Sequence, residues 1–282
     1  MSIDLHIHST MSDGTMTPTE IVRLAASRGL KAIALTDHDT ADGVEEAMNT
    51  GEKCGVEVIS GIELSVKYKQ QNIHLLGYFF DHTDQVFLEA LTRLQQGRVE
   101  RNKKIVKKLN DLGISVDLEE LISTAGNGQM GRPHIARHLI QKGYVATMEQ
   151  AFTELLGQHG RAYVSRFIYQ FPEASGFIKN AGGLTVLAHP YNLVQQHVEV
   201  NRLLQELADL GLDGIEVYYP SHPRKFKKEL RKIAAQRSLF VTGGSDYHGD
   251  IRPGTGLAGG RNITVPDSVL EAMKNQLDGM NV

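Results

Sequence analysis

Two pairs of ionisable side chains stand two residues apart near opposite ends of this 282-residue sequence. His6 and His8 close an alternating apolar and polar run at residues 3–8, and Asp246 and His248 follow an apolar run at residues 239–243. Residues at this spacing in a strand point to the same face. Each pair could therefore present two metal ligands together, although a single His-x-His pair is also compatible with two surface residues.

A second group of candidates follows the apolar run at residues 32–36. Asp37, His38 and Asp39 come directly after it, and burial of three such groups without partners would be costly. Capping of the next helix explains Asp39 alone, so the other two need another reason. Asp13 precedes Gly14, and an Asp in that position is more often part of a turn than a ligand.

Three further candidates lie in apolar strands or just after them. Glu63 follows residues 56–60, His74 interrupts residues 73–78, and His189 follows residues 184–188. A lone histidine such as His74 is more often a satisfied core residue. However, strand after strand carries a His or a carboxylate on its C-terminal side, and these ends converge if the strands are parallel. Such a ligand set without cysteine suits Mn, Fe or Zn, and several metals sharing a carboxylate suit hydrolysis of phosphate esters.

The elements that must position these residues alternate between strands and helices. Apolar runs predict seven strands, at residues 3–8, 32–36, 56–60, 73–78, 184–188, 214–219 and 239–243. Helices are expected from Thr17 to about Gly29, with a capping box between Thr17 and Glu20, and at residues 41–54, 198–210 and 223–236. This alternation predicts an α/β fold, as a parallel barrel or an open parallel sheet.

The range 84–163 shows helical periodicity and no convincing strand. We expect it to form an inserted helical subdomain, a substrate cap, while residues 1–83 and 164–282 form the main domain that carries the metal site. We interpret the basic run at residues 98–108 as a solvated helix face in preference to a contact surface for phosphate backbones.

Composition narrows the class of protein. The formal net charge is −3, so no overall basic field favours wholesale nucleic-acid binding. The single cysteine excludes an intramolecular disulfide and a Cys-rich zinc motif. The sequence shows neither a secretory signal nor a run of about 20 apolar residues, so we expect a cytoplasmic protein that does not bind a membrane. No obligate protein partner is evident.

Four segments resemble the motifs of the PHP (polymerase and histidinol phosphatase) family. They are Asp4-Leu5-His6-Ile7-His8, Thr36-Asp37-His38-Asp39, Ala188-His189-Pro190 and Ser245-Asp246-Tyr247-His248. Their order and spacing match the family over essentially the whole chain. The resemblance implies a distorted seven-stranded (β/α)7 barrel with a trinuclear centre of divalent metal ions, in which Mn is the first expectation and Fe or Zn are alternatives.

The resemblance also implies ligands for each metal. One ion would be held by His6, His8, Glu63 and Asp246, a second by Glu63, His74 and His189, and a third by Asp13, His38 and His248. Some family members have His at the position of Asp13. An aspartate can still bind a metal ion there, but the exchange can alter the metal preference of the site. His38, Asp246 and His248 are the expected catalytic residues. Asp4 and Asp37 are expected to orient imidazole rings.

The predicted substrate-binding residues depend on a narrower resemblance, to one subgroup of the family. Gly131-Arg132-Pro133-His134 and the helical range resemble a subgroup that removes phosphate from nucleoside 3′,5′-bisphosphates, in which some members trim short RNA from its 5′ end. A helix start with Arg132 and His134 would seat the second, non-reacting phosphate. An ordinary helix start is the alternative, and the resemblance to the subgroup favours the phosphate seat. His222 is placed to touch phosphate or else is a capping or surface residue.

The resemblance therefore favours loss of the 3′-phosphate by attack of metal-bound hydroxide, with a nucleotide or a short RNA end as the partner. The alternatives are 5′-to-3′ exonuclease activity on short RNA, histidinol phosphatase activity, and a non-catalytic metal-binding module.

Overall fold

The computed structural model describes residues 3–125, 128–251, 255–258 and 263–280. Its strands are β1 (Asp4–Ile7), β2 (Ala32–Leu35), β3 (Glu57–Tyr68), β4 (Gln71–Tyr78), β5 (Tyr169–Gln170), β6 (Leu184–Leu187), β7 (Gly214–Tyr218) and β8 (Phe240–Gly243). Its α-helices are α1 (Pro18–Ser27), α2 (Val44–Cys54), α3 (Gln85–Asp111), α4 (Leu118–Ala125), α5 (Arg132–Gln141), α6 (Met148–Ala151), α7 (Phe171–Asn180), α8 (Tyr191–Val194), α9 (Val200–Asp209), α10 (Arg224–Gln236) and α11 (Ser268–Met280). All seven expected strands are present, and the α/β class is confirmed.

The sheet runs in the order β1-β2-β3-β4-β6-β7-β8, and the short β5 pairs with β3. Neighbours are parallel along β1, β2 and β3 and again along β6, β7 and β8. The strand β4 is antiparallel to both of its neighbours, so the expectation of a fully parallel sheet is wrong. Only Lys69 and Gln70 separate β3 from β4, and a parallel connection needs a crossover of a dozen or more residues.

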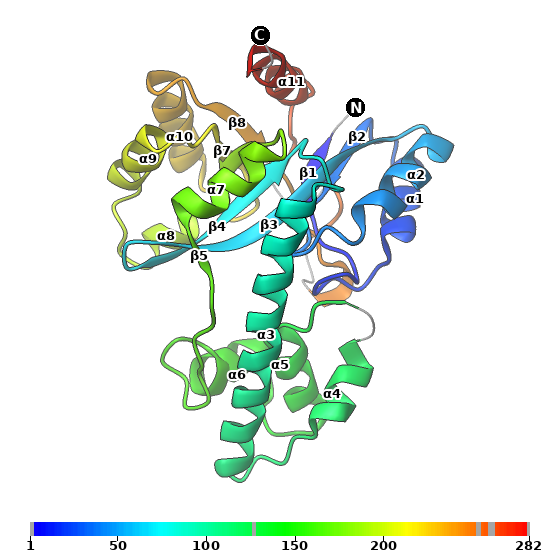
Figure 1. Ribbon diagram of the computed structural model, residues 1–282, viewed down its shortest axis with the longest axis vertical. Helices are drawn as coiled ribbons and strands as arrows, with labels where there is room; N and C mark the ends of the chain where they lie inside the picture. The colour runs from blue at the N-terminus through cyan, green and yellow to red at the C-terminus, as the bar shows by residue number, and fades with distance from the viewer. Residues whose placement is uncertain (1–2, 126–127, 252–254, 259–262, 281–282) are drawn as a thin grey trace.

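The curled sheet brings its first and last strands together. Ile7 at the end of β1 forms a parallel bridge with Tyr247, just after β8, and the His8 amide donates to the Tyr247 carbonyl at 2.9 Å. Gly244 allows this approach, because a Cβ atom there would lie 2.4 Å from the backbone nitrogen of His6. The first and last sequence motifs are therefore neighbours in space (Figure 1).

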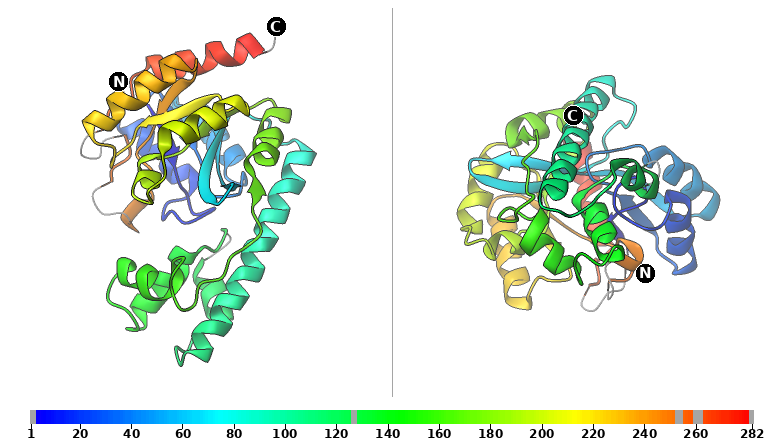
Figure 2. Two further views of the ribbon diagram at one scale, coloured as in Figure 1. Left: turned by 90° about the vertical axis from the view of Figure 1, so that its left-hand side faces the viewer. Right: turned by 90° about the horizontal axis from the view of Figure 1, so that it is seen from below.

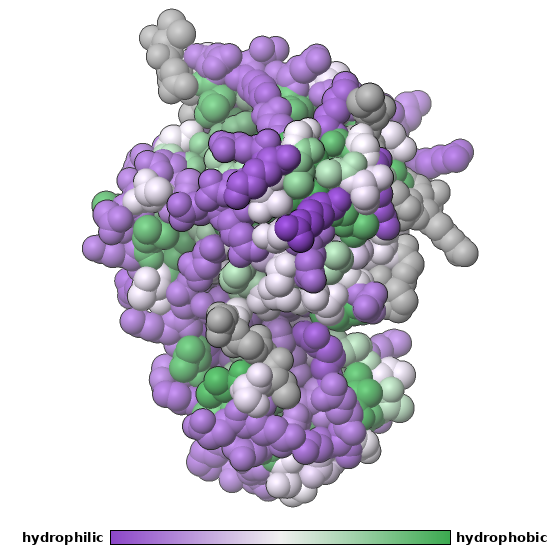
Figure 3. Space-filling view, turned by 90° about the vertical axis from the view of Figure 1, so that its right-hand side faces the viewer, coloured by the Kyte–Doolittle hydropathy of each residue, from purple (hydrophilic) through white to green (hydrophobic). Residues whose placement is uncertain are grey.

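Helices cover the sheet on its outer side. The helix α1 begins with the expected capping box, in which Thr17 and Glu20 satisfy each other's backbone amides. One buried cluster joins α1 and α2 to β1 and β2, and a larger one joins α7, α9 and α10 to β3, β4 and β7. The face in Figure 3 is mostly hydrophilic with small apolar patches. None of the described helices carries an apolar stretch long enough to cross a membrane.

The helices α3, α4, α5 and α6 lie together below the sheet, joined to it by the long α3 and by the segment that leads to β5 (Figures 1 and 2). They share a buried apolar cluster that includes Ile105, Leu109 and Leu139. The helical character of residues 84–163 agrees with the sequence pattern, and their division from the rest of the chain as a cap stays a prediction.

Candidate metal centre and anion pocket

The predicted metal ligands gather on the side of the sheet that faces the helices α3 to α6. They are His6, His8, Asp13, His38, Glu63, His74, His189, Asp246 and His248. Most follow the C-terminal end of a strand. Three lie inside strands: His6 near the end of β1, Glu63 in the middle of β3 and His74 in the middle of the antiparallel β4.

Glu63 is the hub of the cluster. Its Oε1 atom lies 2.8 Å from both His74 Nδ1 and His189 Nε2. The other oxygen, Oε2, faces three more imidazoles at 3.1–3.4 Å, those of His38, His8 and His6. Burial alone would raise the pKa of Glu63, but the surrounding histidines more than offset this effect and hold the pKa well below its usual range. Glu63 therefore presents both of its oxygens to imidazoles, and it belongs to two of the donor groups that could hold a metal ion.

Two aspartates complete the cluster on its other side. Asp246 Oδ1 lies 3.3 Å from His8 Nε2 and 3.5 Å from His6 Nε2. The phenol of Tyr219 donates to Asp246 Oδ2 at 2.7 Å, which fixes the carboxylate. Asp13 Oδ1 lies 3.3 Å from His248 Nε2. Burial opposes ionisation of Asp13, yet the nearby histidines hold its pKa well below the usual range.

Three overlapping groups of these donors could each hold a metal ion. They are His6, His8 and Glu63; His38, Glu63 and His74; and His8, Asp13, His38 and His248. The groups match the expected division only in part: His8 and His38 each belong to two of them, and Asp246 and His189 belong to none. The Nδ1 atom of His38 is buried and has no hydrogen-bond partner, although Glu63 is near. A buried ring nitrogen without a donor or acceptor, inside a cluster of histidines and carboxylates, fits a metal ligand.

Glu216 in β7 is a part of the centre that the sequence reasoning missed. It is fully buried, its Oε1 lies 2.9 Å from His6 Nδ1, and its Oε2 accepts the backbone amide of His189 at 2.7 Å. It therefore orients one ligand through the ring and another through the backbone. An acidic residue between Ile215 and Val217 in an apolar strand was the available signal.

Asp4 and Asp37 do not orient imidazoles directly, which corrects the expectation for both. Asp4 accepts the amide and the hydroxyl of Ser245 at 2.9 and 2.6 Å, so it ties β1 to the segment after β8. Asp37 accepts the amide and hydroxyl of Ser9 and the hydroxyl of Ser12. Both carboxylates hold the loops that carry ligands, because loop amides and hydroxyls are within closer reach than any ring.

The backbone is strained at several of these positions. Asp39, His189 and Asp246 have φ angles of 55°, 28° and 52°, in the left-handed region that residues with a Cβ atom seldom adopt. Such strain persists only where the surroundings enforce it, and it clusters at functional sites. Here the left-handed conformation redirects the side chains that follow β2, β6 and β8.

Asp39 does not cap α2, whose N-cap is Gly43 without a side-chain bond. Instead, its fully buried carboxylate binds two arginines from distant segments. The guanidinium of Arg98 donates through Nε at 2.8 Å and through Nη2, and Arg166 donates at 2.6 Å. Burial opposes the charge on Asp39, but Arg166 and Arg98 hold its pKa well below the usual range. Asp39 thus links the end of β2 to α3 and to the segment before β5.

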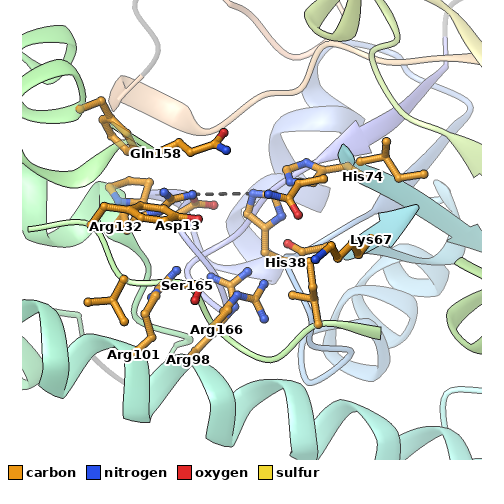
Figure 4. A pocket seen from close by; sticks show the side chains of 18 of the residues that line it. Asp13, His38, Lys67, His74, Arg98, Arg101, Arg132, Gln158, Ser165 and Arg166 are labelled. Carbon is orange, nitrogen blue, oxygen red and sulfur yellow. Dashed lines mark ion pairs between the residues drawn. The ribbon is translucent and has the colours of Figure 1, made fainter. Parts of the chain in front are cut away.

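A cavity of about 420 Å³ extends from the metal cluster toward the helices below. Asp13, His38 and His74 line it on the side of the sheet, and Figure 4 shows side chains from both sides that point into the same space. The opposite wall carries four arginines, Arg98, Arg101, Arg132 and Arg166. Phe152 and Tyr163 add aromatic surface beside Arg132, whose guanidinium carbon lies 5.8 and 5.9 Å from the two ring centroids.

The interpretation of the basic run at residues 98–108 as a solvated face is wrong for its first part. Arg98 and Arg101 are only 7% and 5% exposed and face the cavity. Lys103, Lys104 and Lys107 are exposed, as the pattern predicts. The run therefore divides between two faces of α3, and the sequence pattern alone did not separate them.

His134 and His222 lie in different surroundings. His134 Nδ1 accepts the amide of Gly131 at 3.1 Å at the start of α5, and burial lowers its pKa to about 4. His222 is buried, its Nδ1 lies 3.0 Å from the Val217 carbonyl, and its Nε2 accepts the Tyr191 amide at 3.4 Å. Both ring nitrogens of His222 thus contact backbone groups, and this favours a structural role for His222. A contact of either residue with substrate stays a prediction.

Comparison with known proteins agrees with the motifs. A 3′,5′-nucleoside bisphosphate phosphatase from Chromobacterium violaceum is 33% identical over 263 residues, which cover 93% of this chain and 90% of that protein. A 5′-3′ exoribonuclease from Haemophilus influenzae is 34% identical over 95% of this chain and 96% of its own. A crystal structure assigned as a metal-dependent phosphoesterase from Bifidobacterium adolescentis superposes with a TM-score of 0.88, at 29% identity, over 97% of this chain and 96% of the other.

The model of the PHP domain matches residues 4–186, which include the first two motifs and the arginine wall. Together with relatives that match over nearly their full length, this match is decisive. The chain belongs to the PHP domain family of metal-dependent phosphoesterases.

Proposed function

We propose that this protein is a metal-dependent phosphatase that removes the 3′-phosphate from nucleoside 3′,5′-bisphosphates. The observation that carries the proposal is the arginine wall, which faces the histidine and carboxylate cluster across one cavity. A substrate with two phosphates would place the reacting one at the cluster and the other at the wall. A substrate with one phosphate would leave the wall without a ligand.

The charges of the wall are not balanced by the contacts in the described part of the chain. Arg98 and Arg166 share one carboxylate, that of Asp39. Arg101 donates to the amide oxygen of Asn102, and Arg132 donates to the carbonyl of Leu156. Burial and the neighbouring arginines lower the pKa of Arg101. Since buried cations without a counter-charge are unfavourable, a phosphate dianion would stabilise the wall, and guanidiniums suit it geometrically.

The metal cluster would supply the reaction chemistry. We expect three divalent ions, with Mn as the first expectation, held by the nine predicted ligands, of which seven belong to the three donor groups. Bound ions would neutralise the negative charge on the phosphate oxygens. They would also lower the pKa of a bound water and so make it a better nucleophile. The chain's own contribution is to position these ligands: Glu63 would offer both of its oxygens to the ions, Glu216 orients His6, and Tyr219 fixes Asp246. The predicted catalytic residues His38, Asp246 and His248 would thus act by holding ions against the reacting phosphate.

Residues 84–163 would serve as a cap for the nucleoside. They supply Arg98, Arg101, Arg132 and Phe152 to the cavity, while the sheet supplies the ligands. The aromatic rings of Phe152 and Tyr163 offer a surface on which a base could stack. We expect the protein to act in the cytoplasm, where nucleotides are available.

A second candidate is 5′-to-3′ exonuclease activity on short RNA. The same wall would seat a 5′-phosphate and place the first phosphodiester at the cluster, and the Haemophilus relative is described as such an enzyme. Histidinol phosphate fits less well, because its ammonium group would face four arginines. A non-catalytic module is disfavoured, because a donor residue occupies every expected ligand position.

The test is phosphate release by the Mn-loaded protein from four compounds: adenosine 3′,5′-bisphosphate, adenosine 3′-phosphate, histidinol phosphate and a 5′-phosphorylated short RNA. The proposal expects the bisphosphate to give the highest kcat/KM. Preferential shedding of nucleotides from the RNA would move the role to RNA trimming. Equal rates on the bisphosphate and the 3′-monophosphate would contradict the role of the arginine wall.

A further inference from the structure

The carboxylate of Asp39 divides its two oxygens between the sheet and the arginine wall. Its Oδ1 atom accepts the backbone amide of Ser65 in β3 at 2.9 Å. Its Oδ2 atom accepts Nε and Nη2 of Arg98, which approach it as one edge of the guanidinium, and Nη2 of Arg166 at 2.6 Å. A single buried oxygen thus holds two of the four wall arginines, one from α3 and one from the segment before β5.

Asp39 is also fastened to the metal cluster through the backbone. It follows the predicted ligand His38, which forms a parallel bridge with Glu63. The Asp39 amide donates to the Glu63 carbonyl at 3.1 Å, and enclosing contacts of this kind sustain its left-handed φ angle of 55°. On the other side, Gln95 Nε2 donates to the Asp39 carbonyl at 3.3 Å, one helical turn before Arg98. One residue therefore sets the wall in register with the cluster.

The two arginines stand between the Asp39 carboxylate and the cavity. Arg98 and Arg166 line the cavity (Figure 4), whereas Asp39 is 0% exposed and does not line it. Asp39 takes the Nε and Nη2 edge of Arg98, so the Nη1 atom points elsewhere. That atom lies at the start of α5, where a Cβ atom on Gly131 would be 3.5 Å from it, beside Arg132. Within the described residues no acceptor is bonded to this Nη1 atom, so its N–H groups are available to a ligand.

Two effects of opposite sign would act on a phosphate at the wall. The negative charge of Asp39 would repel a dianion and weaken its binding. The same carboxylate fixes two long side chains that would otherwise lose their rotational freedom when the ligand binds, and this strengthens binding. The second effect should dominate, because two guanidiniums share one carboxylate and keep a net positive charge, and because they separate that carboxylate from the cavity.

We propose that Asp39 is a positioning residue that holds Arg98 and Arg166 in the orientation that binds the second phosphate of the substrate. A guanidinium that is held at one edge can still present another edge to two phosphate oxygens. Selectivity for bisphosphates then depends on a buried residue that does not touch the substrate. This inference rests on the proposed function, since it concerns the same phosphate seat.

The experiment compares Asp39→Asn with Asp42→Asn, an exposed neighbour, in the Mn-loaded protein. Steady-state kinetics are measured with adenosine 3′,5′-bisphosphate and adenosine 3′-phosphate, and calorimetry gives the Kd of adenosine 5′-phosphate. Asp39→Asn should raise KM for the bisphosphate, and Kd for adenosine 5′-phosphate, by about 10-fold, the value of one charge-assisted hydrogen bond. The ratio of kcat/KM between the two substrates should fall by the same factor, whereas a mere loss of folded protein would leave that ratio unchanged. Asp42→Asn should match wild type.

A double-mutant cycle with Arg98→Met tests whether Asp39 acts through the arginines. Asp39→Asn should cost less affinity for adenosine 5′-phosphate in the Arg98→Met background than in wild type. The combined variant leaves one buried cation fewer without its partner, so it should fold even where Asp39→Asn alone does not. In that case it is compared with Arg98→Met, and it should bind more weakly, because Arg166 also loses its acceptor.

Three results would overturn the inference: tighter binding after loss of Asp39, an unchanged ratio of kcat/KM, or fully additive losses in the cycle. Tighter binding in particular would show that charge repulsion outweighs orientation. If wild type itself does not prefer the bisphosphate to the 3′-monophosphate, the proposed function fails. The calorimetric comparison then still decides the role of Asp39, because it requires no turnover.

Discussion

Glu63 Oε1 lies 2.8 Å from His189 Nε2, although 126 residues separate the two in the sequence. Both side chains are buried or nearly so, and the same oxygen also meets His74. The contact joins the two parallel halves of the sheet at the antiparallel β4 that lies between them. The metal centre is therefore assembled by the curl of the sheet and by no single local motif.

The central position of Glu63 in the cluster predicts a severe effect of Glu63→Gln. The amide removes the negative charge shared by five imidazoles and offers one oxygen where the carboxylate offers two. Turnover should fall by at least about 100-fold, because metal stabilisation of the transition state is worth several kcal/mol. Steady-state assays and metal analysis check this, with Glu57→Gln at the exposed start of β3 as control. Retention of full Mn content and full rate would exclude a bridging role.

The pairing of Asp39 with two arginines predicts a loss of stability in Asp39→Asn. The change leaves Arg98 and Arg166 buried beside a neutral amide, and breaking a buried ion pair on one side typically costs about 3 kcal/mol. Urea denaturation measures the free energy of unfolding, and Asp42→Asn, an exposed neighbour, serves as control. A difference below about 0.5 kcal/mol between the two variants would mean that Asp39 is not the clamp inferred here.

The two faces of α3 predict different outcomes for two substitutions in the basic run. Arg101→Met removes a buried cation from the cavity, so KM for a bisphosphate should rise by about 10- to 100-fold, the value of one charge-assisted hydrogen bond. Lys104→Met changes an exposed residue and should leave KM unaltered. Kinetics with adenosine 3′,5′-bisphosphate decide the point. Similar changes in KM for the two variants would indicate a general effect of positive charge and not a specific contact between Arg101 and the substrate.

The contacts of Glu216 predict weaker metal binding in Glu216→Gln. A glutamine has a single acceptor oxygen, so it cannot accept from both His6 Nδ1 and the His189 amide. Loss of such a supporting contact typically lowers metal affinity by about 10- to 100-fold. Competition with a chelator measures the change, and Glu229→Gln on the exposed face of α10 is the control. An unchanged metal affinity would show that Glu216 does not support metal binding.

Sequence patterns predicted the strands well because buried β-structure needs continuous apolar runs, as at β2 and β6. They also identified the candidate ligands that the structure brings together, whose residue types have few other uses at strand ends. The direction of β4 was missed because the expected strand ended at residue 60 and left residues 61–72 for a crossover, whereas β3 continues to Tyr68. The helices α7 and α11 were not predicted either.

The anion pocket was harder to predict, for a physical reason. Arg98, Arg132 and Arg166 come from three separate segments, and only the tertiary fold brings them together. In the sequence, Arg98 and Lys104 belong to one charge run, yet one is buried and the other exposed. Burial of a charge depends on the partner that approaches it, and helical periodicity contains no information about that partner.

The central claim is that the arginine wall seats the second phosphate while the metal cluster receives the 3′-phosphate. The most direct measurement follows adenosine 3′,5′-bisphosphate and adenosine 3′-phosphate by phosphorus NMR, with wild type and with Arg132→Ala. We predict that wild type gives adenosine 5′-phosphate and inorganic phosphate. Arg132→Ala should raise KM for the bisphosphate by about 10-fold or more and leave the 3′-monophosphate unaffected. Release of the 5′-phosphate, or equal losses on both substrates, would contradict the account.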